Sequence, residues 1–117
     1  MSYATPAGAS AEEVMDRFHE AWNRHDLPAA LAMTSTNCVF EETIGEVRSV
    51  GRTEIEAVWK PIFADPSTHI TVEESFTAGD HLVQRWRYDW DGGHVRGVDV
   101  IKVRDGLVTE KLAYVKG

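Results

Sequence analysis

The chain has 117 residues, a net charge of −7, 43 % hydrophobic residues and 26 % charged residues, which predicts one globular domain. The acidic balance without a basic run argues against nucleic acid or an acidic membrane surface as partner, because both need clustered Lys and Arg. The single cysteine excludes an intrachain disulfide, and no apolar run approaches the ~20 residues of a membrane helix. With no secretory signal in the first ten residues, we expect a cytoplasmic protein with a flexible tail at 1–10 and one domain at 11–117.

The first half of the chain shows helical periodicity. Ser10 and Glu13 have the spacing of a capping box, and an apolar stripe follows, which predicts a helix over residues 11–24. Asp26 as N-cap and Pro28 in the first turn predict a second, short helix, which residues 34–37 should end with turn-forming side chains.

A third helix is predicted after residue 52. Thr53 and Glu56 again have capping-box spacing, and Pro61 predicts a kink or a helix end nearby, because it cannot donate the helical hydrogen bond. The apolar positions recur with the helical period at Ile55, Val58, Trp59, Ile62 and Phe63.

Most of the remaining chain reads as strands. Alternation and β-branched residues predict strands at 38–43, 69–77, 82–90, 95–104 and 107–115, with a loop or short hairpin at 45–51. Three turn signals separate the last four strands, at residues 79–80, 92–93 and 105–106. This order predicts an α+β protein with a meandering, mostly antiparallel sheet.

The turn signal at 92–93 allows side chains to be assigned to faces. A two-residue turn there pairs Trp86 with Asp99 and Tyr88 with Gly97, so that these residues share one face of the sheet. The other face carries charged side chains, together with Val98 and Val100. Asp99 is therefore predicted to be a carboxylate on the apolar, helix-covered face.

Several segments resemble nuclear-transport-factor-2-like proteins. The first segment is Phe18 with residues 22–27, at the end of the first predicted helix, and the second is the strand at residues 39–45 after the second helix. The third is the start of the third helix at residues 51–55, and the fourth is the pair of late strands at residues 97–106. The chain resembles in particular the SnoaL-like polyketide cyclases and the ketosteroid isomerases, over roughly residues 11–116. The resemblance implies a cone-shaped α+β fold, with three N-terminal helices packed on a curved, mostly antiparallel sheet and a pocket for a small apolar molecule between them.

The resemblance also implies roles for two carboxylates. Glu42 falls at the position of the isomerase base, Asp99 at that of the protonated, hydrogen-bond-donating aspartate, and Phe18 where the family has a tyrosine donor. In SnoaL-like cyclases an aspartate on the strand of Asp99 acts as acid/base. An apolar environment favours the neutral, proton-donating form of such a carboxyl group. The alternative is a structural carboxylate held by Trp86 or Tyr88, and for Glu42 a solvated charge at a strand end.

Seven aromatic residues are candidates to line a ligand cavity, although plain core packing is the alternative for each. They are Phe18, Trp22, Phe40, Trp59, Phe63, Trp86 and Tyr88. His19, His69, His81 and His94 are scattered without metal-ligand spacing, so no metal site is expected. No cofactor is expected either, because a carboxylate in an apolar pocket suffices for enolisation or aldol chemistry.

Two classes of function remain open. One is a cofactor-independent isomerase or cyclase that transfers protons on a neutral hydrophobic carbonyl compound through Asp99 and Glu42. The other is a non-catalytic module that binds a ligand or a partner protein, which the phenylalanine at position 18 favours. Within the enzyme class, epoxide hydrolysis, which relatives of this fold perform, is a further hypothesis. Val98 and Val100 on the outer face predict a homodimer through the sheet. The direction of Glu110 is left open, because a bulge would reverse it.

Overall fold

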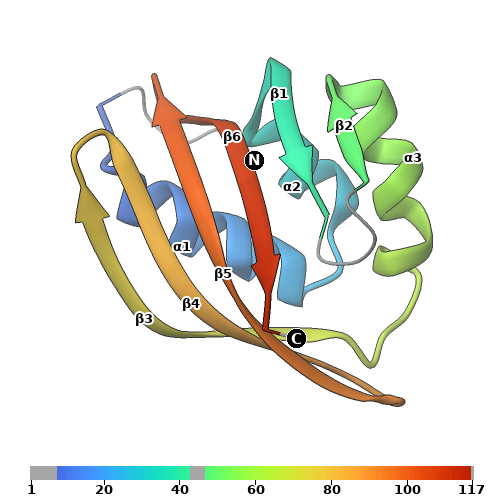
Figure 1. The fold of residues 1–117 in the computed structure, drawn as a ribbon. Helices are drawn as coiled ribbons and strands as arrows, with labels where there is room; N and C mark the ends of the chain where they lie inside the picture. Colours follow the sequence, from blue (N-terminus) through green and yellow to red (C-terminus); the bar gives the residue numbers. More distant parts are fainter. Residues whose placement is uncertain (1–7, 43–46, 117) are drawn as a thin grey trace.

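A computed structural model describes residues 8–42 and 47–116, which form three helices and a six-stranded sheet. The sheet order is β2-β1-β6-β5-β4-β3, and only the β1–β6 pair is parallel among the described strands. The helices lie against one face of the curved sheet (Figure 1). The elements are α1 (Ala11–Asn23), α2 (Leu27–Ala32), β1 (Thr34–Glu41), β2 (Arg48–Val50), α3 (Arg52–Phe63), β3 (His69–Ala78), β4 (His81–Trp90), β5 (Gly93–Arg104) and β6 (Leu107–Val115).

The α+β class is confirmed, and the cone shape stays a prediction. Most of the tail expected at 1–10, and part of the segments expected at 38–43 and 45–51, lie outside the described residues. Within the described ranges, no helix is both long enough and apolar enough to cross a membrane.

The first two helices begin where their capping residues predict. The Ser10 side chain accepts a hydrogen bond from the Glu13 backbone at 3.2 Å, and the Glu13 carboxylate accepts one from the Ser10 backbone. Asp26 caps α2 by accepting from the Ala29 backbone at 3.1 Å. These local hydrogen bonds fix the residues at which α1 and α2 begin, and therefore which of their side chains face the sheet.

Two boundaries differ from the sequence-based prediction. Strand β1 begins at Thr34, since Thr34 pairs with Val108 of β6 and thereby continues the sheet through residues whose side chains favour turns. Helix α3 is capped by Gly51, with φ 87°, and not by Thr53; the Glu54 carboxylate accepts instead from the Val50 backbone. Pro61 lies inside the last turn of α3, and the helix ends two residues later at Phe63, which agrees with the end predicted near Pro61.

The β4–β5 hairpin is shifted by two residues from the predicted register. Its turn is formed by Asp91 and Gly92, so Trp86 pairs with Gly97 and Gln84 with Asp99. Because side chains alternate with period two, this shift leaves every residue on its predicted face. Gly97 is required here: a Cβ atom would lie 2.7 Å from Cζ2 of Trp86 and 2.6 Å from a backbone oxygen of β6.

A bulge in β6 decides which of its side chains face inward. Val103 pairs with Val108, but the next pairs are Lys102 with Glu110 and Ile101 with Lys111, so one extra residue has entered β6. A regular ladder would place Glu110 opposite Ile101, on the inner face with Asp99. The bulge puts Lys111 there instead, and directs Glu110 to the outer face.

Candidate functional site

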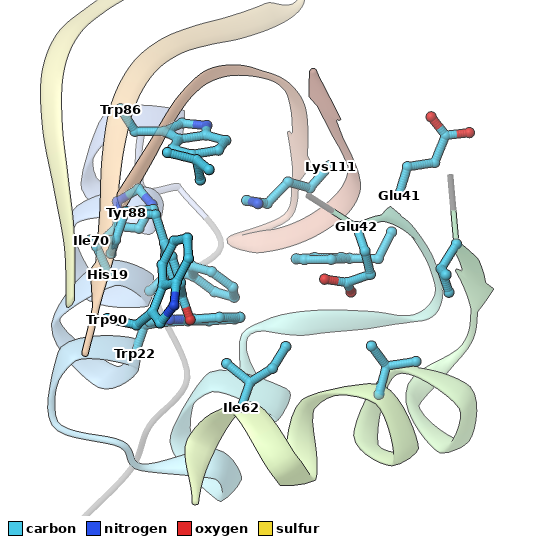
Figure 2. A pocket seen from close by; sticks show the side chains of 15 residues that line it. His19, Trp22, Glu41, Glu42, Ile62, Ile70, Trp86, Tyr88, Trp90 and Lys111 are labelled. Carbon is cyan, nitrogen blue, oxygen red and sulfur yellow. The ribbon is translucent and has the colours of Figure 1, made fainter. Parts of the chain in front are cut away.

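A cavity of about 290 Å³ lies between the helices and the inner face of the sheet, with a volume close to the lower end of the usual range for ligand sites (Figure 2). Its wall is mostly apolar and includes residues of α1, α3 and every strand except β2. The lining residues are Phe18, His19, Trp22, Phe40, Glu41, Glu42, Val47, Val58, Ile62, Ile70, Trp86, Tyr88, Trp90, Val95 and Lys111.

The seven aromatic candidates divide into a wall and a support behind it. The wall contains Phe18, Trp22, Phe40, Trp86 and Tyr88. Trp59 and Phe63 are core residues outside the lining. The Trp59 ring lies edge-on to Phe18, Trp22 and Phe40 at centroid distances of 5.7, 5.2 and 4.9 Å. It therefore holds three wall rings in place without lining the cavity itself.

Glu42 follows the last residue of β1 and directs its carboxyl group into the cavity, whereas the Glu41 carboxylate points away (Figure 2) and pairs with Arg48 at 2.9 Å. Burial raises the pKa of Glu42, and the ammonium group of Lys111 partly offsets that rise. The Trp59 indole also favours the charged form, but burial is the larger effect. Neither Trp59 Nε1 nor Glu42 Oε1 has a hydrogen-bond partner of ordinary geometry among the described residues.

Asp99 and Lys111 form a buried ion pair at the sheet side of the cavity. Asp99 has no exposed surface, the Lys111 side chain is 10 % exposed, and Lys111 Nζ lies 2.9 Å from Asp99 Oδ2. They are diagonal neighbours on β5 and β6, since Asp99 pairs with Ala113 and Lys111 with Ile101. Lys111 Nζ also lies 4.8 Å from the centre of the Phe40 ring. Lys111 thus lines the cavity, whereas Asp99 has no surface that a ligand can contact.

His19 is the second polar residue of the wall that the sequence reasoning missed, after Lys111. It is buried on α1, and its Nε2 atom has no hydrogen-bond partner among residues 8–42 and 47–116. Burial, and then the charge of Lys111, lowers the pKa of His19 to about 3, so the imidazole is neutral at physiological pH. The helical period from Met15 through His19 to Trp22 is the signal that places it inside.

Some of the lining residues that were not among the sequence-based candidates could have been found from the sequence pattern, and Lys111 could not. Val58 and Ile62 belong to the apolar stripe of α3, while Ile70 and Val95 flank Tyr88 on neighbouring strands. Lys111 had no sequence signal, because its direction depends on the bulge. In the part of the chain that the structure describes, no three His, Cys, Asp or Glu side chains are grouped to hold a metal ion.

The lowered pKa of His19 predicts a specific loss of stability in acid. Between pH 6.5 and about 3 the unfolded chain binds a proton at His19 that the folded chain does not. His19 therefore leaves the free energy of unfolding unchanged above pH 6.5 and lowers it progressively as the pH falls below that value. Between about pH 7.5 and about pH 5, the free energy of unfolding measured in urea should fall by on the order of 1–2 kcal/mol more for the wild type than for His19→Gln. His94→Gln, at an exposed position, is the control. Equal losses in wild type and His19→Gln would show that His19 binds its proton as readily when folded.

The family model of the SnoaL-like domain matches residues 15–111. A nuclear-transport-factor-2-like protein of unknown function from Mesorhizobium loti is 37 % identical, with 91 % of this chain and 90 % of that chain covered and a TM-score of 0.78. No curated protein matches.

Two further structures share the fold and were solved with small molecules. One is a Mycobacterium tuberculosis protein in complex with estradiol-17β-hemisuccinate, at 24 % identity, 89 % and 92 % coverage and a TM-score of 0.78. The other is a Catenulispora acidiphila protein of ketosteroid isomerase-like fold in complex with trimethylamine, at 19 % identity, 90 % and 86 % coverage and a TM-score of 0.76. The match to the family model and the 37 % identical relative show that the chain belongs to the SnoaL-like family of the nuclear-transport-factor-2-like superfamily.

Proposed function

We propose that this protein binds a small, mostly apolar carbonyl compound in the cavity, and that Glu42 removes and returns a proton at the carbon next to the carbonyl group. The observation that carries the proposal is the Glu42 carboxyl group, which faces an apolar cavity with one buried oxygen unpaired within the described residues. Desolvation brings the pKa of Glu42 closer to neutral pH, and a base is most effective when its pKa lies near the working pH.

Asp99 is less well placed than Glu42 to exchange protons with a ligand. It has no exposed surface, and its Oδ2 atom lies 2.9 Å from Lys111 Nζ. The acid/base role of Asp99 remains a prediction, but the geometry supports Glu42 as the base. Such a reaction needs no cofactor, because the carboxylate itself accepts the proton.

The alternative is a binding module without catalysis. It is favoured by Phe18, which lines the cavity with a ring that has no hydrogen-bonding group, at the position where the isomerases have a tyrosine. The complexes of the M. tuberculosis and C. acidiphila proteins with small molecules agree with either function. A cytoplasmic location also remains a prediction.

Glu42→Gln separates the two functions. Hydrogen–deuterium exchange at the acetyl methyl group of 2-acetylnaphthalene in D₂O, followed by proton NMR, measures proton removal directly. We expect wild type to accelerate this exchange, and Glu42→Gln to lose on the order of 10²–10⁴-fold of that acceleration, which is the usual contribution of a general base. The affinity for the ketone should remain, because the amide keeps the shape of the cavity wall.

Glu74→Gln, an exposed carboxylate of β3, is the matched control and should exchange like wild type. Binding without accelerated exchange in the wild type would instead establish the binding module.

A homodimer through the outer face of the sheet is also proposed. Phe76, Val83, Val100 and Leu112 are neighbours in successive strands β3, β4, β5 and β6 and form one apolar row across that face. Phe76 is 51 % exposed and Tyr114, beside the row, is 57 % exposed. Exposed apolar surface of this kind is typical of an interface.

Size-exclusion chromatography with light scattering tests the dimer. We expect the wild type to have about twice the chain mass of 13.1 kDa, and a Phe76→Lys, Tyr114→Lys double variant to have the mass of one chain, because the added charges lose hydration in the contact. Ala57→Lys, exposed on α3, is the control. A monomeric wild type would refute the proposed dimer.

A further inference from the structure

We infer that Lys111 binds the carbonyl oxygen of the ligand, and that Asp99 acts as a positioning residue by holding the Lys111 ammonium group at the cavity wall. The inference rests on the proposed function, and it assigns to the site a ligand with an uncharged acceptor oxygen. It is carried by the position of Lys111, which is the one ammonium group among the residues that line the described cavity (Figure 2).

The ammonium group of Lys111 has donors to spare. A lysine ammonium carries three N–H groups, and the contact with Asp99 Oδ2 at 2.9 Å occupies at most one of them. That contact is an ion pair without hydrogen-bond geometry, since neither Asp99 oxygen has a hydrogen-bond partner among the described residues. The Phe40 ring, with its centre 4.8 Å from Nζ, stabilises the charge but is a poor hydrogen-bond acceptor. At least one N–H group is therefore available to an oxygen atom placed in the cavity.

The charges around Lys111 select a neutral ligand over an anion. Asp99 already balances Lys111, and His19 adds no charge because its imidazole is neutral. A ligand carboxylate would therefore meet the field of Asp99 and Glu42 without a free positive charge to compensate it. A ketone or aldehyde oxygen avoids that repulsion and still accepts a charge-assisted hydrogen bond from Lys111.

The same arrangement supports the proposed proton transfer. When Glu42 removes the proton, the C–H bond breaks, its electron pair forms a carbon–carbon double bond, and the carbonyl oxygen becomes the enolate oxygen. Glu42 holds the proton, which either returns to carbon or exchanges with solvent, so that in D₂O the carbon receives a deuteron instead. Lys111 then faces a full negative charge where it had faced a partial one, so its hydrogen bond is stronger in the enolate than in the ketone.

Asp99 contributes through Lys111 alone. It contacts no cavity surface, but its carboxylate sets where Nζ lies along the wall. Without that partner, the flexible lysine side chain has no fixed position, and the ammonium group is free to turn toward Glu42 or toward solvent.

A pair of probes that differ only at the oxygen tests the inference. These are 2-acetylnaphthalene and 2-isopropenylnaphthalene, in which a CH₂ group replaces the carbonyl oxygen. Binding is followed by quenching of tryptophan fluorescence, since Trp22, Trp86 and Trp90 line the cavity. We expect wild type to prefer the ketone by roughly tenfold or more, as for a hydrogen bond to a charged group. Lys111→Met should bind both probes equally, and Asp99→Asn should reduce the preference while it retains the alkene.

The double variant Asp99→Asn, Lys111→Met keeps the test decisive if a single variant fails to fold, because it removes both charges of the pair and leaves neither one buried without the other. It should fold and bind both probes equally. Lys102→Met, on the outer face of β5, is the control and should keep the wild-type preference.

Equal binding of the two probes by the wild type, or a ketone preference that survives loss of Lys111, would overturn the inference and leave the role of Glu42 intact. Failure of the wild type to bind either probe would overturn the proposed function together with this inference.

Discussion

The buried ion pair of Asp99 and Lys111 is the constraint on which the polar side of the cavity depends. Each charge would be costly in the protein interior without the other, because burial removes both from water. Their contact requires β5 and β6 to present these two side chains on the same face, and the bulge in β6 achieves this. A regular ladder would direct Glu110 toward Asp99 and bring two carboxylates together in a dry environment. The pair therefore favours the bulged register over the regular one.

The apolar side of the cavity depends on packing around two positions. Trp59 supports three aromatic side chains of the wall from behind, and Gly97 leaves the space that the Trp86 ring occupies. Interiors are packed closely enough that a change of one methyl group at such positions is felt. The cavity is therefore a defined shape with a small polar region, formed by Glu42, His19 and Lys111, in which a single oriented ligand can be held.

Local signals predicted most of the fold and part of the site. Capping residues and the 3.6-residue period located α1 and α2, and alternation placed Asp99 and Trp86 on the inner face even though the hairpin register was wrong by two residues. The start of β1 was missed because pairing with β6, a long-range contact, overrides the turn preference of residues 34–37. Lys111 was missed for a related reason: a bulge of one residue reverses the direction of every later side chain, and no local pattern in β6 announces it. The face of the sheet that carries Asp99 was predicted correctly. The sequence did not show that Lys111 is its ion-pair partner, or that Asp99 has no surface facing the cavity.

The interdependence of Asp99 and Lys111 is most directly tested by a double-mutant cycle on stability. The free energies of unfolding in urea are measured for wild type, Asp99→Asn, Lys111→Met and the double variant. If the two side chains form the buried pair described above, Lys111→Met should cost about 3–5 kcal/mol, because Asp99 is left charged and unpaired, and the double variant should recover much of that loss. If the two substitutions instead have small and additive effects, the charges do not depend on each other, and the account of the site built on their contact is wrong.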